Sequence, residues 1–207
     1  MSVLFSSAYF PPLSYMAALL SYDRVCIEAK ETFPKQTYRN RMEIMTAGGV
    51  RTLTVPVLRE NHSMTEDVRI DYHDRWNVIH LRTLMAAYAA SPYYMFYRDD
   101  IENLLMCRYD SILELNTAII HWLLRKLKVN TELSLTTDFE PPCGDKDDYR
   151  YTFTPKCECQ MFDISPYYQV FSDRMPFTPN LSVLDLLFNL GPEACGYLRS
   201  LKKIKEM

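Results

Sequence analysis

Glycine is scarce in this chain of 207 residues: it occurs five times, against 12 prolines. With so few glycines the chain has no glycine-rich loop to cradle phosphate groups, which excludes the P-loop and dinucleotide-binding classes. Cationic charge is not in excess either, because 23 Lys and Arg stand against 26 Asp and Glu, for a net charge of −3. That balance argues against a protein that coats nucleic acid through bulk charge, although a local basic site is compatible with it.

Long apolar runs are also lacking. No segment approaches the roughly 20 uninterrupted apolar residues of a membrane helix. Residues 1–22 carry no charged side chain, but a signal peptide needs a basic start and a continuous apolar core, and Pro11-Pro12 interrupts this segment. We therefore expect a cytoplasmic protein with no membrane insertion.

Familiar catalytic and metal-binding motifs are missing as well. The chain has no nucleophile elbow, no Walker loop and no zinc-protease helix. Its six cysteines are scattered, and the densest group, Cys143 with Cys157 and Cys159, lacks the paired spacing and the nearby histidine that would complete a zinc site. We expect free thiols, no metal and no cofactor.

What is present is the composition of a globular chain, with 48% hydrophobic and 24% charged residues, and we expect one domain over residues 1–207. The beginning of the chain is predicted to form a strand, a helix and a second strand over residues 3–8, 13–22 and 24–29, which is the pattern of a βαβ unit. If the two strands are parallel, ligands bind beyond their carboxyl ends, at Ser6 to Phe10 and Glu28 to Lys35.

The rest of the chain alternates short strands with helices. Residues 41–45 and 51–58 form a predicted hairpin, residues 133–137 a predicted strand, and the expected helices start at Asp74, Ser91, Asp110 or Ser111, and Ser182. Ser182 with Asp185 resembles a capping box, and Gly191-Pro192 ends that helix. The pattern therefore predicts an α/β fold in which the βαβ unit and the hairpin form a small mixed sheet, packed with central and C-terminal helices.

The densest group of functional side chains is the basic segment, Phe33 to Arg41, which holds three cations and two amides and no acid: Lys35, Arg39, Arg41, Gln36 and Asn40. Guanidinium groups bind phosphate or carboxylate bidentately, so this segment suits an anion. In the βαβ interpretation it lies beside the first strand's end, where Ser6, Ser7 and Tyr9 point. The alternative is a solvated basic loop paired with neighbouring glutamates, Glu28, Glu31 and Glu43, and the spacing leaves both open.

His80 is the second candidate, because it falls on the apolar stripe of the first long predicted helix. A general acid/base is one interpretation, since histidine titrates near the working pH. A buried, hydrogen-bonded core histidine is the other.

Several blocks of the sequence, in this order and spacing, resemble the WbqC-like protein family over nearly the whole chain. The blocks are Ala8 to Pro12 with Tyr15, Phe33 with Lys35 to Arg41, Leu53 to Val57, Trp76 with His80, Tyr88 with Ser91 to Tyr94, and Phe177 to Pro192. Members usually carry a Gln-Pro pair before the first block, where Ser6-Ser7 stand here.

The family is named for a gene of bacterial O-antigen clusters, so the resemblance implies a transferase of surface-polysaccharide biosynthesis that acts on an activated, anionic donor such as a nucleotide sugar. It supports Lys35, Arg39, Asn40, Arg41 and His80 as site residues, and it adds Asn180 and Asp185.

Three functions follow as hypotheses. In the first, a transferase holds an anionic donor through the basic segment, with His80 as general base. In the second, a non-catalytic module binds an anionic metabolite or a protein partner through the same segment. In the third, the aromatic side chains form contacts within a homo-oligomer. None of the three involves nucleic acid.

Overall fold

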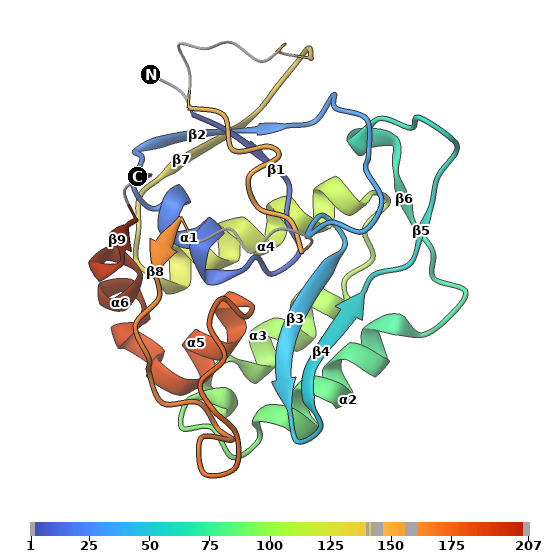
Figure 1. Cartoon of the computed structure of the whole chain (residues 1–207). Helices are drawn as coiled ribbons and strands as arrows, with labels where there is room; N and C mark the ends of the chain where they lie inside the picture. Colours follow the sequence, from blue (N-terminus) through green and yellow to red (C-terminus); the bar gives the residue numbers. More distant parts are fainter. Residues whose placement is uncertain (1–2, 140, 142–146, 156–160, 205–207) are drawn as a thin grey trace.

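A parallel three-stranded sheet forms one end of the molecule. The computed structural model describes residues 3–139, 141, 147–155 and 161–204. Strand β1 (Val3–Ser6) leads through α1 (Leu13–Leu19) to β2 (Arg24–Glu28), which runs parallel to β1. Strand β7 (Glu132–Leu135) adds to the other edge of β2, also parallel, in the order β1-β2-β7 at the top of Figure 1. The predicted α/β fold and its βαβ start are confirmed.

The predicted hairpin is present but pairs only with itself. Strands β3 (Arg41–Thr46) and β4 (Gly49–Thr54) form a separate antiparallel ladder rather than extending the parallel sheet. The second arm ends before Pro56, because proline cannot donate to a ladder. After it, β5 (Val57–Leu58) pairs with β6 (Arg69–Ile70) in a further short ladder.

Three long helices occupy the middle of the chain: α2 (Trp76–Tyr88), α3 (Tyr94–Met106) and α4 (Ile112–Lys126). Of the two predicted starts of α4, Asp110 and Ser111, the structure has Ser111 as the N-cap, in a full capping box with Glu114. The predicted Asp74 cap of α2 is wrong, since Arg75 occupies the N-cap position and caps with no side-chain hydrogen bond.

The C-terminal part holds short elements: β8 (Phe162–Asp163), α5 (Val183–Leu190), a 3₁₀ turn (Gly191–Glu193), α6 (Ala194–Ser200) and β9 (Lys202–Lys203). Another 3₁₀ turn, Thr65–Asp67, lies between β5 and β6. Ser182 caps α5 by accepting from the Leu184 amide. The capping-box prediction is wrong in its second half, because the Asp185 carboxylate binds side chains from other elements instead.

One cluster of buried apolar side chains, drawn from Val3 to Leu201, connects these elements. All seven residues of α1 are buried, between the sheet and the C-terminal helices. Among the described residues, none of the helices has both the length and the apolar character of a membrane span. Cys26, Cys107 and Cys195 are free thiols, whereas Cys143, Cys157 and Cys159 lie outside the described residues.

Candidate functional site: a basic pocket beside the parallel sheet

The basic segment packs against the carboxyl end of β1. The Tyr9 amide donates to the Tyr38 carbonyl at 2.8 Å. Asn116 on α4 joins the same two parts, because its Nδ2 donates to the Ser7 hydroxyl at 3.2 Å and to the Arg39 carbonyl at 2.7 Å. The strand end and the segment are thus neighbours in space, the arrangement that the βαβ pattern predicted.

Backbone pairing holds both ends of the basic segment. At its start the Phe33 amide donates to the Ser63 carbonyl at 2.9 Å. At its end the Asn40 carbonyl accepts from the Val55 amide at 2.8 Å, and the Asn40 side chain donates back to the Val55 carbonyl at 2.9 Å. A segment tied at both ends presents its side chains in a preorganised arrangement, which lowers the entropic cost of binding.

Between these ties lies a pocket of about 260 Å³, here called the basic pocket. Its lining consists of three cations, two amides and two apolar side chains: Lys35, Arg41, Arg59, Gln36, Asn40, Phe33 and Val57. Four of the residues predicted to bind substrate, Lys35, Gln36, Asn40 and Arg41, therefore line one cavity.

The charge of the basic pocket is uncompensated by its own lining, which contains no carboxylate. Lys35, Arg41 and Arg59 form no ion pair with any residue that the structure describes. The Arg41 Nε is also buried and has no hydrogen-bond partner within the described ranges. A buried guanidinium nitrogen without an acceptor is costly, and an anionic oxygen in the pocket would satisfy it.

Arg59 is oriented by the wall of the pocket. Its Nη1 donates to the Phe33 carbonyl at 3.3 Å, and its guanidinium carbon lies 5.8 Å from the centroid of the Phe33 ring. Nearby, Gln36 has a φ of 60°, in the left-handed region that non-glycine residues seldom adopt. Residues in such conformations gather at ligand sites, where the surrounding structure enforces them.

Arg39 does not line the basic pocket. Its Nε and Nη2 donate to the two carboxylate oxygens of Glu31 at 2.8 and 2.7 Å, and both side chains are 1% exposed. The expectation that Arg39 binds substrate directly is therefore corrected. The alternative, pairing with a neighbouring glutamate, describes Arg39, but the pair is buried rather than solvated.

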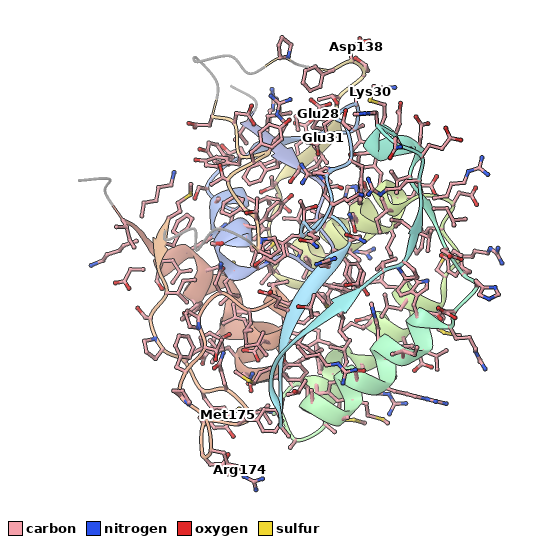
Figure 2. All side chains as sticks on the ribbon, turned by 45° about the vertical axis from the view of Figure 1, so that its right-hand side comes forward. Glu28, Lys30, Glu31, Asp138, Arg174 and Met175 are labelled. Atoms are coloured by element: carbon pink, nitrogen blue, oxygen red, sulfur yellow. The ribbon has the colours of Figure 1, made fainter. Side chains whose placement is uncertain are left out.

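A second buried ion pair adjoins the first. Arg150 donates to Glu28, the last residue of β2, at 2.9 Å and also pairs with Asp148. The two pairs are linked, since Arg39 Nη2 donates to the Arg150 carbonyl at 3.2 Å. Figure 2 shows Glu28 and Glu31 close together where β2 ends. The chain at and just after the carboxyl end of β2 therefore holds two linked, buried ion pairs, one of which includes Arg39 of the basic segment.

His80 lies in the core, 3% exposed, with both ring nitrogens engaged. The Thr54 carbonyl accepts a hydrogen bond from the ring, which leaves Nδ1 to accept from the Tyr9 hydroxyl at 2.9 Å. Burial lowers the pKa of His80 from 6.5 to about 4, so the ring is neutral at neutral pH. It does not line the basic pocket. This geometry is that of a hydrogen-bonded core histidine.

The other predicted site residues also serve structural contacts. Ser7 and Tyr9 are buried and bind Asn116 and His80 as described. The Asn180 side-chain oxygen accepts from the Ser14 amide at 2.9 Å, so it caps α1 from a distant part of the chain. Asp185 is fully buried and accepts hydrogen bonds from Tyr88 and Tyr167.

Arg59 lines the basic pocket but is not among the site residues predicted from the sequence. It follows the short β5 strand, two positions after Val57, which lines the same pocket. In an extended chain, residues two apart lie on the same face, so the sequence could have placed Arg59 on the face of Val57. Nothing local, however, indicated that this strand end faces the basic segment.

Comparison with known proteins identifies the family. The model of the WbqC-like protein family matches residues 6–161. The chain belongs to the WbqC-like family. Among its relatives is the "Uncharacterized protein Rv1507c" of Mycobacterium tuberculosis (strain ATCC 25618 / H37Rv), 26% identical over 220 residues, which cover 93% of this chain and 95% of that protein. No solved structure matches the chain. The matched range of this WbqC-like chain includes every residue that lines the basic pocket, but not Asn180.

Proposed function

We propose that this WbqC-like protein binds an anionic metabolite, one that carries a phosphate or carboxylate group, in the basic pocket. The observation that carries the proposal is the set of three cations, Lys35, Arg41 and Arg59, which face one small cavity without an acid in its lining. Two of the three are arginines, whose planar guanidinium groups match phosphate and carboxylate oxygens in pairs.

The volume of the basic pocket fits only the anionic group and its immediate surroundings, because ligand pockets for whole small molecules are usually about 300–1,000 Å³. The amide side chains of Gln36 and Asn40 would orient that group. Such a site serves as the donor site of a transferase, the activity that the family resemblance implies, and serves equally in a module that binds a metabolite without converting it.

The surroundings of His80 favour the non-catalytic binding module over the transferase. A general base must reach the proton that it removes and must be free to accept it. Here Nδ1 already accepts from Tyr9, burial keeps the ring neutral, and the ring does not border the pocket. A transfer reaction with His80 as base would require the Tyr9 contact to open.

Isothermal titration calorimetry with pyrophosphate, nucleotides, nucleotide sugars and acyl-CoA thioesters tests the binding step. Replacing Arg41 by Gln removes a charge-assisted donor worth about 1.5–3 kcal/mol, so we expect the Kd to rise by about 10- to 100-fold. Arg51→Gln is the matched control, because Arg51 is exposed on β4 and does not line the pocket. Binding that Arg41→Gln leaves unaltered would refute the proposal.

The same ligand then separates the two alternatives. Wild type and His80→Gln are incubated with the bound ligand and candidate sugar or amine acceptors, and ³¹P NMR follows the ligand. The binding-module alternative predicts an unchanged ligand. Turnover that falls at least about 100-fold in His80→Gln, with the Kd unchanged, would instead establish the transferase with His80 as its base.

A further inference from the structure

We propose that the ligand is a phosphorylated sugar, whose phosphate occupies the basic pocket and whose hydroxyl groups lie along a larger neighbouring groove. This inference rests on the proposed function, because it extends the same site. The observation behind it is that Arg59 lines both cavities: the basic pocket and a groove of about 650 Å³, here called the polar groove. A ligand held by Arg59 thus has room on both sides of that side chain.

The polar groove is built on the ladder of β5 and β6 and on the turn that follows β5. In that turn the Glu60 amide donates to the Ser63 hydroxyl at 2.9 Å. Leu58 and Arg69, opposite each other in the ladder, both line the groove. The groove therefore has a defined backbone on two sides.

The chemistry of the polar groove is mixed. Carboxylates, an amide, an imidazole and a guanidinium face it: Glu60, Asp67, Asn61, His62 and Arg69. None of these five side chains forms a hydrogen bond or an ion pair with another residue in the described part of the chain. They are available to a ligand.

Sugar hydroxyls fit this lining better than other ligand groups do. Each hydroxyl both donates and accepts, and the groove offers carboxylate acceptors beside cationic and amide donors. A nucleobase or an acyl chain needs an aromatic or apolar surface, and Leu58 is the sole apolar side chain that lines the groove within the described residues. The acids also disfavour a ligand that is anionic along its whole length, which places the charge at the basic pocket alone.

The test is calorimetric titration of wild type with inorganic phosphate, glucose 1-phosphate, glucose 6-phosphate and AMP. We expect at least one hexose phosphate to bind about tenfold or more tighter than inorganic phosphate, and tighter than AMP. The double variant Glu60→Gln/Asp67→Asn should lose most of that advantage, to about threefold or less, while its Kd for inorganic phosphate stays the same or falls slightly because negative charge has been removed. Glu102→Gln, an exposed acid on α3, is the control.

The outcomes distinguish this inference from the proposed function. Phosphate that binds through Arg41, with hexose phosphates no tighter than phosphate itself, would overturn the polar groove as a sugar subsite and leave the anion site standing. AMP that binds tighter than both hexose phosphates would overturn it in favour of a nucleotide. Failure of all four probes to bind would remove the anion site and the inference together.

Discussion

Arg39 and Glu31 form a bidentate ion pair in the interior, Nε to Oε1 at 2.8 Å and Nη2 to Oε2 at 2.7 Å, at the base of the loop that carries the basic pocket. Arg41, two residues further along the chain, lines that pocket instead. Arginines that the sequence presents as equivalent thus have different roles. Arg39 ties the basic segment to Glu31, and Arg41 lines the basic pocket.

The first prediction concerns that ion pair. Removing one partner leaves a buried charge uncompensated, so Arg39→Met should lower the free energy of unfolding by about 3–5 kcal/mol. The double variant Arg39→Met/Glu31→Leu should cost less than the sum of the single changes, because it leaves neither charge behind. Urea unfolding followed by circular dichroism measures all three.

The matched control is the exposed pair of Arg24 and Glu132, joined at 3.0 Å. Solvent and salt screen such a pair, so Arg24→Met should change the stability little. An Arg39→Met protein as stable as Arg24→Met would contradict the role assigned to the buried pair.

The second prediction concerns pH and His80. Because the folded-state pKa is lowered to about 4, the unfolded chain binds a proton below pH 6.5 that the folded chain does not bind. The unfolding free energy should therefore fall as the pH drops from about 6.5 towards 4, by roughly 3 kcal/mol in all. His80→Gln, which cannot be protonated, should lose this part of the pH dependence in urea titrations.

The measured quantity is the difference between wild type and His80→Gln, because other buried groups act in the opposite direction. Burial raises the pKa of Glu31 and of Asp185, so those carboxyls add stability as the pH falls. They are common to both proteins and cancel in the difference. Parallel pH profiles for the two proteins would rule out the buried, neutral His80.

The third prediction concerns how much the hydroxyl group of Tyr88, as distinct from its ring, contributes to the stability of the fold. Tyr88 and Tyr94 both pack on Phe188, with ring centroids 4.9 and 5.2 Å from it. Only the Tyr88 hydroxyl is bonded on two sides, since it accepts from the Met45 amide at 3.1 Å and donates to Asp185 at 2.9 Å. Tyr88→Phe should cost about 2 kcal/mol of unfolding free energy.

Tyr94→Phe is its control, because the Tyr94 hydroxyl forms no hydrogen bond to a residue in the described ranges. We expect a much smaller change there, as the ring contact with Phe188 is kept. Equal losses in the two variants would mean that the hydroxyl contacts of Tyr88 add nothing to stability.

The fourth prediction concerns two glycines near the C-terminus. Gly191 has a φ of 53°, and a Cβ placed on it would lie 2.5 Å from the Tyr93 ring. Gly191→Ala should therefore destabilise the protein by about 2 kcal/mol or more. Gly196 lies inside α6 with open space around it, so Gly196→Ala should add about 0.5–1 kcal/mol. Thermal unfolding of both variants checks that the first lowers the stability and the second raises it.

Local signals in the sequence predicted much of the fold. The apolar runs before and after α1 indicated the two strands, because apolar patterning is read over a few residues, whereas their parallel pairing joins residues about 22 apart. The start of α4 was indicated at Asp110 or Ser111, because capping hydrogen bonds form within one turn. The stripe of α2 was less informative: Ile79 falls on it and is 52% exposed. Periodicity defines a face but not how much of that face another element covers.

The site was only partly predictable for the same reason. The basic segment and its position beside β1 followed from composition and from the βαβ rule, since the carboxyl ends of parallel strands lie at one edge. The third cation, Arg59, lines the pocket because the β3–β4 hairpin pairs Thr54 with Arg41 and so returns the chain to the basic segment a few residues before Arg59. Asn180, expected at a substrate site, instead caps α1 from a position 166 residues along the chain from Ser14.

The sequence by itself determined the α/β class, the family resemblance and the presence of an anion-compatible segment, because each depends on residue types and spacings within short windows. The tertiary structure alone decided which of its cations line the basic pocket. Arg39 and Arg41 have the same chemistry, but folding placed Glu31 and the Arg150 carbonyl within reach of Arg39 and left Arg41 beside an open cavity. That difference arises from long-range packing, in which a charge either finds a buried partner or stays available to a ligand.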